Sequence, residues 1–192
     1  MTYLLYGSIL SDMTFLELAK KRRSTRKYSA KSVPREVIER CLEAARLAPS
    51  ACNSQPWSFI VVDNGKGRND LAEAAFSGIH SMNTFAKKAP VLIIVVTEQS
   101  VYVAKVGGYL KGVQYNLIDV GIACEHLCLA AAEEGVGTCW LGWFNEKAVK
   151  KVLGLPDNKK VDVIISMGYP ENEEPREKIR KALDQIRRYW PQ

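Results

Sequence analysis

The segment from about Val113 to Glu134 is the most apolar helical stretch of the chain, and it limits the folds open to it. Apolar residues occupy almost every side of this predicted helix: Val113, Leu117, Val120, Ile122, Leu127, Leu129 and Ala130–Ala132. Such a helix must be buried on most of its faces. Asn116, Asp119, Glu125 and His126 argue against a membrane span. The pattern therefore predicts burial in a protein core or in a dimer interface.

Three β-branched runs predict strands at residues 58–62, 91–97 and 161–167, and residues 138–143 predict a weaker fourth strand. Apolar residues at helical spacing and helix-ending signals predict further helices from about Thr14 to Arg22, from Pro34 up to Pro49, from Asn145 to Leu153 and from about Arg176 to Tyr189. We find no repeat and no linker that would divide the chain. Residues 1–192 are therefore expected to form a single domain.

The positive charge of the chain is concentrated in one place. Lys and Arg number 27 against 21 Asp and Glu, for a formal net charge of +6. Residues 20–27, KKRRSTRK, hold six basic residues and no acid, so the rest of the chain sums to zero. A general nucleic-acid binder would usually spread its charge over a face, whereas a local excess suggests one anionic group bound at one position.

The N-terminal sequence and the cysteines indicate a cytoplasmic protein. The first residues lack the positive region of a secretory signal, and no run of eighteen apolar residues could span a bilayer. Five cysteines at irregular spacings are typical of reduced thiols rather than of a disulfide framework. We therefore expect no membrane partner.

Several familiar chemical sites find little support. Cys124 and Cys128 share a helix face, but His126 points elsewhere and no second pair completes four zinc ligands, so no metal is expected. With only two histidines, His80 and His126, a Ser-His-Asp or Cys-His arrangement is unsupported. The chain contains no GxxxxGK[ST], and GVGTCWLG (135–142) misses the spacing of GxGxxG.

Two polar segments can be interpreted in two ways. RRSTRKY (22–28) could be a solvated basic turn, but several cationic groups and a hydroxyl within a few residues also suit a phosphate monoester. PSACNSQPW (49–57) could be an ordinary helix-to-strand connection. Its amide donors and acceptors beside a tryptophan also suit the edge of a planar heterocycle.

Together these segments resemble the FMN-dependent nitroreductase family. RRSTRKY is similar to that family's RRSxRx[FY], PSACNSQPW to its PSxxNxQPW loop, and GVGTCWLGWF to its G-x-G-T/S-C-W-x-G segment. KAPVLIIVV and MGYP resemble two of its strands. The resemblance covers about residues 14–180, which leaves residues 1–13 as an N-terminal extension.

The resemblance implies an α+β fold, a three-layer sandwich with a central, mainly antiparallel sheet flanked by helices. It also implies a homodimer with the long buried helix at the interface and an FMN site at each of two subunit junctions. Asn83 is interpreted as an ordinary surface residue. Ala51 stands where many relatives have serine, which removes one hydrogen bond.

The resemblance also assigns site residues. Arg22, Arg23 and Ser24 would contact the phosphate and ribityl chain, and Arg26 the pyrimidine side of the flavin. The flavin loop of the partner subunit would supply Pro49, Ser50, Ala51 and Asn53, with Gln55 supporting the loop. The remaining implied contacts are the backbone of Trp140, Leu141 and Gly142 along the flavin N5 edge, and the late phosphate ligands Lys178 and Arg180.

The implied activity is transfer of hydride from NAD(P)H through flavin N5 to a nitroaromatic, a quinone or a similar small acceptor by a ping-pong mechanism. No protein acid or base is required, so no catalytic residue is assigned beyond Arg26, which would tune the flavin. Two alternatives stay open. One is reductive dehalogenation or ene reduction on the same scaffold, selected by a lid near residues 76–110. The other is a non-enzymatic module binding nucleic acid, although interleaved aromatics are hard to find outside residues 20–27.

Overall fold

The central element is an antiparallel sheet with the strand order β1-β2-β4-β3, seen in a computed structural model that describes residues 13–63, 65–98, 112–171 and 177–190. Its strands are β1 (Trp57–Val62), β2 (Val91–Thr97), β3 (Gly137–Leu141) and β4 (Lys160–Gly168). Each corresponds to a strand expected from the sequence, although β3 ends at Leu141 rather than at residue 143. The fold is therefore of the α+β class.

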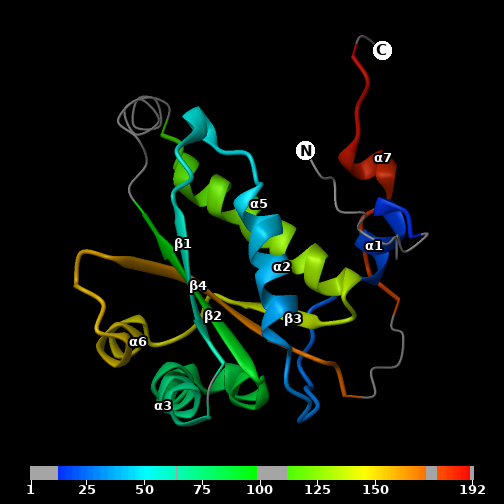
Figure 1. Cartoon of the computed structure of the whole chain (residues 1–192). Helices are drawn as coiled ribbons and strands as arrows, with labels where there is room; N and C mark the ends of the chain where they lie inside the picture. The colour runs from blue at the N-terminus through cyan, green and yellow to red at the C-terminus, as the bar shows by residue number, and fades with distance from the viewer. Residues whose placement is uncertain (1–12, 64, 99–111, 172–176, 191–192) are drawn as a thin grey trace, which may run out of the picture.

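Helices cover both faces of this sheet. α2 (Arg35–Arg46) and α5 (Tyr115–Glu133) pack on one face, and α3 (Gly65–Ala75), the 3-10 segment η2 (Gly78–Lys88) and α6 (Glu146–Leu153) pack on the other. Figure 1 shows α2 and α5 crossing in front of the sheet, with α3 and α6 together at its lower left. β2 is buried along its whole length because Ile93 faces the first layer and Ile94 the second. This arrangement confirms the three-layer sandwich.

Local signals place the ends of two helices next to functional segments. α1 (Phe15–Lys21) begins at a capping box in which Thr14 Oγ1 accepts from the Glu17 backbone and Glu17 Oε2 accepts from the Thr14 backbone. It ends at Lys21 with Arg22 as its C-cap, so the basic run begins in the last turn of the helix, where the dipole favours cations. α6 has Asn145 as its N-cap and Gly154 in the left-handed region after it, as its sequence predicts.

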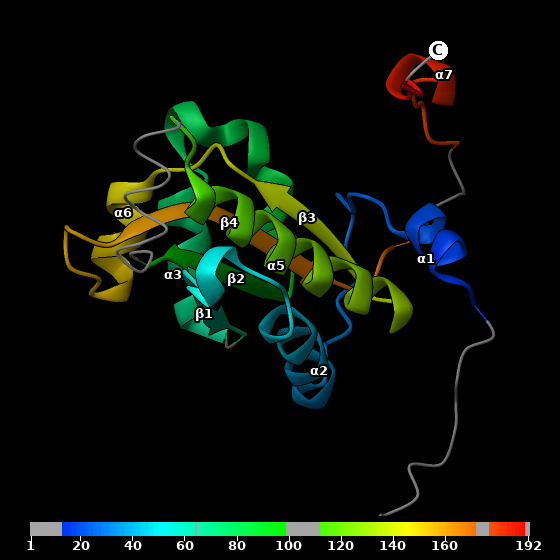
Figure 2. The ribbon, with the colours of Figure 1, turned by 90° about the horizontal axis from the view of Figure 1, so that it is seen from above.

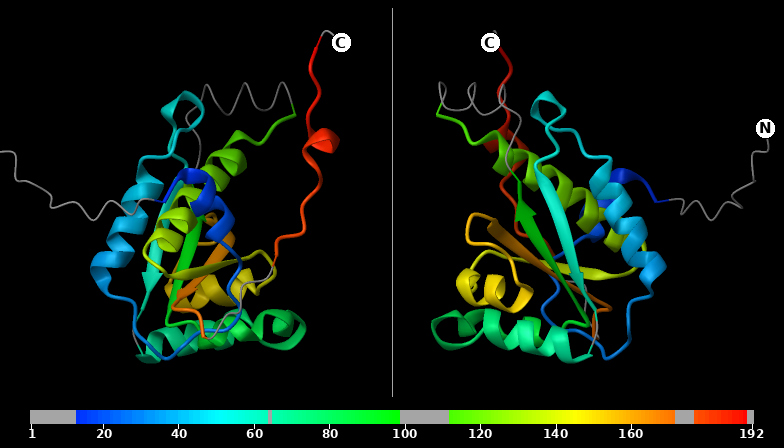
Figure 3. Two further views of the ribbon diagram at one scale, coloured as in Figure 1. Left: turned by 90° about the vertical axis from the view of Figure 1, so that its right-hand side faces the viewer. Right: turned by 60° about the vertical axis from the view of Figure 1, so that its left-hand side comes forward.

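The predicted helix from Arg176 to Tyr189 is wrong over most of its length. Arg176 lies outside the described residues, and among residues 177–190 only α7 (Leu183–Ile186) is helical. This segment leaves the body of the molecule (Figures 2 and 3), and Ile179 and Trp190 are more than nine-tenths exposed. Leu183 and Ile186 of α7 are also exposed within the described structure, and a short helix with so little packing is marginal in water, which explains the loss of helical structure.

Two further differences concern the middle of the chain. α3 and η2 have no counterpart among the elements expected from the sequence. Of the expected lid region, residues 99–111 lie outside the described residues. In the described ranges, no helix is both long enough and apolar enough to cross a membrane.

Candidate functional site

The basic segment runs from the end of α1 along the free edge of β3. Ser24 and Thr138 form a parallel bridge, and the Thr25 amide donates to the Thr138 carbonyl at 2.9 Å. Thr25 is fully buried, and a Cβ on Gly137 would lie 2.2 Å from its Oγ1, so only glycine permits this approach.

Tyr28 fixes the far end of the same segment. Its hydroxyl donates to the Thr25 carbonyl at 2.8 Å and shares a 2.7 Å hydrogen bond with Ser166 Oγ on β4. Because Thr25 and Tyr28 are buried while Ser24 and Arg26 are exposed, the segment is anchored by its inward residues and presents the others outward.

Four cations gather where this segment leaves α1. Lys178 Nζ donates to the Ala19 carbonyl at 2.6 Å, which brings the C-terminal segment against α1. Partial burial lowers the pKa of Lys178, and the positive charges of Arg22, Arg180 and Arg23 lower it further. The structure therefore brings together four of the positions that the resemblance assigns to the phosphate and the adjoining chain.

Sequence reasoning missed the acidic member of this cluster. Glu125 on α5 lies with its Oε1 3.4 Å from Arg22 Nε, and the Arg22 side chain is only 18% exposed. Glu125 also acts against the lowering of the Lys178 pKa. The sequence signal that could have identified this role is an acidic residue within the mostly apolar α5.

A concave surface adjoins the cations. A cavity of about 380 Å³ is bounded by Lys21, Arg22 and Arg23 on one side and by residues 135–138 on the other. The basic side chains thus border a hollow rather than a flat surface.

Arg26 lies near the end of β3. Burial raises the pKa of the Cys139 thiol, while the charges of Arg26 and Arg22 and a hydrogen bond with Ser24 act in the opposite direction. The Arg26 guanidinium also lies 5.9 Å from the centroid of the Phe85 ring on η2. Arg26 is therefore close to the strand that carries Trp140 and Leu141.

Gly142 follows that strand directly. It is exposed, and a Cβ built on it would meet no atom within 4 Å. Leu141 is buried against the α3 and α6 layer, whereas Trp140 packs against the α2 and α5 layer. The backbone beyond β3 is thus held by its neighbours and open to approach. Asn83, expected to be an ordinary surface residue, donates from Nδ2 to the Trp143 carbonyl at 2.9 Å.

The polar loop after α2 includes the short 3-10 turn η1 (Ala51–Asn53) and is tied to α5. Buried Asp119 accepts from the Ala51 amide at 3.0 Å through Oδ1 and from Ser54 Oγ at 3.4 Å through Oδ2. The sequence interpretation did not assign this role to Asp119. An acid among the apolar residues of α5 was again the signal.

The loop is also braced internally and strained. Ser50 Oγ accepts from the Gln55 amide at 3.0 Å, and Gln55 Nε2 donates to Asn53 Oδ1 at 3.1 Å. Cys52, Asn53 and Gln55 all have positive φ, at 53°, 53° and 44°. Such backbone costs free energy and persists only when surrounding contacts hold it, which is typical of ligand-binding segments.

The loop and the cation cluster of one chain approach α5 from different sides. Asp119 and Glu125 are six positions apart, which corresponds to a rise of about 9 Å and a separation of about 120° around the helix. In Figure 1 the loop lies at the upper end of α5, and α1 lies beside its other half.

The cysteines on α5 are packing residues. Cys124 and Cys128 are fully buried, and burial raises the pKa of the Cys128 thiol to about 11. His126 Nδ1 lies 3.2 Å from the Ala44 carbonyl on α2. Among the described residues, no three His, Cys, Asp or Glu side chains gather as metal ligands would.

Comparison with known proteins identifies the family of the chain. The family model described as Nitroreductase family matches residues 19–82 and 80–169. The chain belongs to the nitroreductase family. A nitroreductase family protein of Clostridium difficile 630 has a similar structure, with a TM-score of 0.73, 32% identity and coverage of 94% of this chain and 100% of the other. An FMN-dependent nitroreductase of Clostridium difficile R20291 gives a TM-score of 0.71, 29% identity and coverage of 93% and 99%.

Two curated relatives carry different activities in their names. A protein of Methanothermobacter thermautotrophicus, named provisionally as an NADH dehydrogenase or NAD(P)H nitroreductase, is 35% identical over 84% of this chain and 80% of its own length. Iodotyrosine deiodinase 1 of Mus musculus is 33% identical over 92% of this chain and 70% of its own length. This nitroreductase family chain is accordingly an oxidoreductase by family.

Proposed function

We propose that this chain is an FMN-dependent oxidoreductase that uses NAD(P)H to reduce a nitroaromatic, a quinone or a similar acceptor. The observation that carries the proposal is that Lys178 reaches the Ala19 carbonyl on α1, where Arg22 and Arg23 border a cavity and the charge of Arg180 also acts on Lys178. These side chains come from two segments about 155 residues apart in sequence, and like charges gather in a fold at a cost unless an anion joins them.

The donor set suits the phosphate of FMN. A phosphate monoester carries about −1.5 to −2 charges near neutral pH. Glu125 pairs with Arg22, and the charges of Lys178 and Arg180 lie beside this pair. The exposed Ser24 hydroxyl is in the same segment and supplies a neutral donor for the phosphate or the adjoining ribityl chain.

A second copy of the chain would complete the site. Because the loop of one chain approaches α5 from a different side than its own cations, the flavin ring would receive the loop of a partner in a homodimer. That loop would bring Pro49, Ser50, Ala51 and Asn53 to the ring edge, with its conformation held by Gln55 and Asp119.

Bound FMN would supply the redox chemistry by accepting a hydride from NAD(P)H and passing it to the acceptor. The residues of the chain would bind the flavin and polarise its ring. Arg26 would place a fixed positive charge near the pyrimidine edge, where negative charge develops on reduction. The open backbone at Gly142 would lie along the N5 edge, and neither step requires a protein acid or base.

The experiment is reconstitution of the purified protein with FMN. We expect flavin absorbance at about 450 nm to stay with the protein through gel filtration. We also expect steady-state oxidation of NADH or NADPH with menadione or p-nitrobenzoate as acceptor. Comparing the two nicotinamides identifies the donor. Failure to retain FMN would contradict the proposal.

Reductive dehalogenation is the second candidate, favoured by the iodotyrosine deiodinase match over 92% of the chain. Reduced protein incubated with iodotyrosine would release iodide and tyrosine if this activity is present. Iodide release that exceeds the rate with menadione would favour this candidate over the first.

A further inference from the structure

Trp143 is a surface aromatic residue whose position is fixed by η2. Its indole Nε1 donates to the Ile79 carbonyl at 3.0 Å, and its own carbonyl accepts from Asn83 Nδ2 at 2.9 Å. Its ring lies 5.3 Å from that of His80, tilted by 40°. Even so, 53% of Trp143 is exposed. Because the polar N–H is already satisfied, the exposed part of the ring is apolar surface available for stacking.

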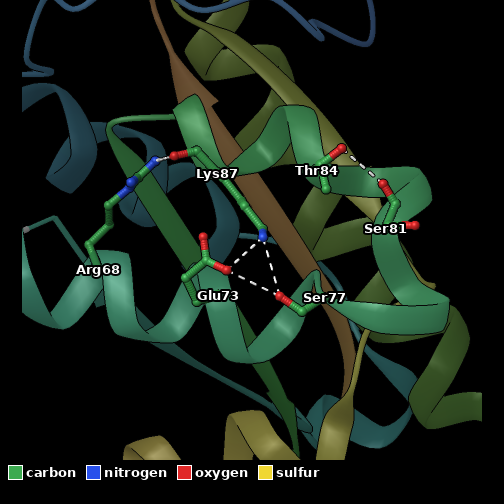
Figure 4. Close-up of polar contacts among 6 residues, drawn as sticks. All are labelled: Arg68, Glu73, Ser77, Ser81, Thr84 and Lys87. Carbon is green, nitrogen blue, oxygen red and sulfur yellow. Dashed lines mark hydrogen bonds and ion pairs between the residues drawn. The ribbon is translucent and has the colours of Figure 1, made fainter.

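The element that holds Trp143 is itself braced against α3. Lys87 Nζ donates to Glu73 Oε2 at 2.7 Å and to Ser77 Oγ at 3.2 Å, and Ser77 Oγ donates to the same carboxylate at 3.1 Å. Arg68 donates to the carbonyls of Lys87 and Ala89. Figure 4 shows how these side chains tie the end of η2 to α3. These contacts hold η2 (Gly78–Lys88) against α3, and this supported segment is called the η2 wall.

This wall extends between the two positions expected at the flavin. At one end Phe85 lies beside Arg26, the residue assigned to the pyrimidine edge. At the other, Trp143 follows Gly142, the residue assigned to the N5 edge, and consecutive Cα atoms are about 3.8 Å apart. Along the wall, Ile79 and Met82 are about four-fifths exposed.

We propose that Trp143, flanked by Ile79 and Met82, is the surface on which a planar aromatic electron acceptor stacks while it is reduced. The proposal rests on the flavin function given above. An aromatic ring and a thioether are apolar, polarisable partners that suit a flat aromatic ring better than an aliphatic one. A quinone bound there would gain one hydride from the flavin and one proton from solvent, which yields the hydroquinone.

The test measures acceptor binding without turnover. Menadione is titrated calorimetrically into oxidised, FMN-loaded protein with no nicotinamide present, for the parent protein and for Trp143→Leu, Trp143→Phe and the control Trp190→Leu. Trp190 is an exposed tryptophan on the C-terminal segment. We expect about tenfold weaker binding for Trp143→Leu, because stacking is lost, and a smaller loss of about two- to threefold for Trp143→Phe. Trp190→Leu should match the parent protein.

Equal menadione affinities for the parent and Trp143→Leu proteins would overturn the proposal, as would the absence of menadione binding to the parent protein. Light scattering on the same samples tests whether a second subunit, rather than an electron acceptor, covers Trp143. If Trp143→Leu shifts a dimer toward monomer, Trp143 is a subunit contact and the proposal is wrong. Failure of the proposed flavin function would be seen separately. The parent protein would then not retain FMN, or its flavin would not be reduced by NAD(P)H.

Discussion

Asp119 should control both the stability of the chain and its affinity for the flavin ring. Its carboxylate accepts from the Ala51 amide at 3.0 Å and from Ser54 Oγ at 3.4 Å while being 3% exposed. Hydrogen bonds to charged groups contribute about 1.5–3 kcal/mol each, against about 0.5–1.5 kcal/mol for neutral ones. Asp119→Asn keeps one acceptor oxygen and should therefore lower the free energy of unfolding by about 1–2 kcal/mol. For a chain of this size that corresponds to a fall in Tm of roughly 2–8 °C.

Asp119→Ala should cost more, about 2–4 kcal/mol, because it also leaves the Ala51 amide without its acceptor. Since the loop is expected at the ring and not at the phosphate, affinity for FMN and for riboflavin should fall in parallel. Asp162→Asn is the matched control, because Asp162 accepts from Thr97 Oγ1 at 2.6 Å at the sheet, away from the loop. Calorimetric unfolding and flavin titration measure both effects. A destabilised Asp119→Ala protein with unchanged flavin affinities would refute a role of the loop at the ring.

Three further predictions concern charge and subunits. Arg26→Gln should lower the FMN midpoint potential by tens of millivolts in spectroelectrochemical titration, because about 1–2 kcal/mol of its attraction for reduced flavin should survive screening and about 1.4 kcal/mol equals roughly 30 mV; an unchanged midpoint would remove Arg26 from the pyrimidine edge. Subunit exchange between Asn53→Asp and Arg22→Glu proteins should restore about one working site per heterodimer. Activity that stays at the level of the two mutant homodimers would place both residues in the same chain's site. The lowered pKa of Lys178 means that stability of the flavin-free protein should rise as pH increases through that lowered value toward the unfolded value of about 10.4; this rise should be absent in Lys178→Met, and its persistence there would assign it to another group.

The sheet and three of the flanking helices, α2, α5 and α6, could be predicted because their signals are local and strong. The β2 run VLIIVVT is apolar at every position except the last, and it is indeed buried on both faces. Asn145 and Gly154 mark the ends of α6 at the residues that the structure confirms. The prediction of a long C-terminal helix was wrong because the apolar residues of that segment, such as Ile179, have helical spacing but are exposed in the described structure.

The candidate site was only half visible in the sequence. The cations of residues 22–26 stand out as a motif, and their meeting with Lys178 depends on the path of the chain back to α1. Asp119 and Glu125 could not be assigned roles because each acts on a residue more than sixty positions away. The position of Trp143 against η2 was equally hidden, since it depends on an element with no clear sequence signal.

The central claim is that the cation cluster binds the phosphate of FMN, and one titration tests it most directly. FMN and riboflavin are titrated into the parent protein, Arg22→Ala and Arg46→Ala, an exposed arginine of α2 paired with Glu43. Each lost charge-assisted contact costs about 1.5–3 kcal/mol, so Arg22→Ala should bind FMN roughly ten- to a hundredfold more weakly. Its affinity for riboflavin, which lacks the phosphate, should stay close to that of the parent, and Arg46→Ala should bind both flavins as the parent does. Equal losses of FMN and riboflavin in Arg22→Ala, or no loss of either, would contradict the claim.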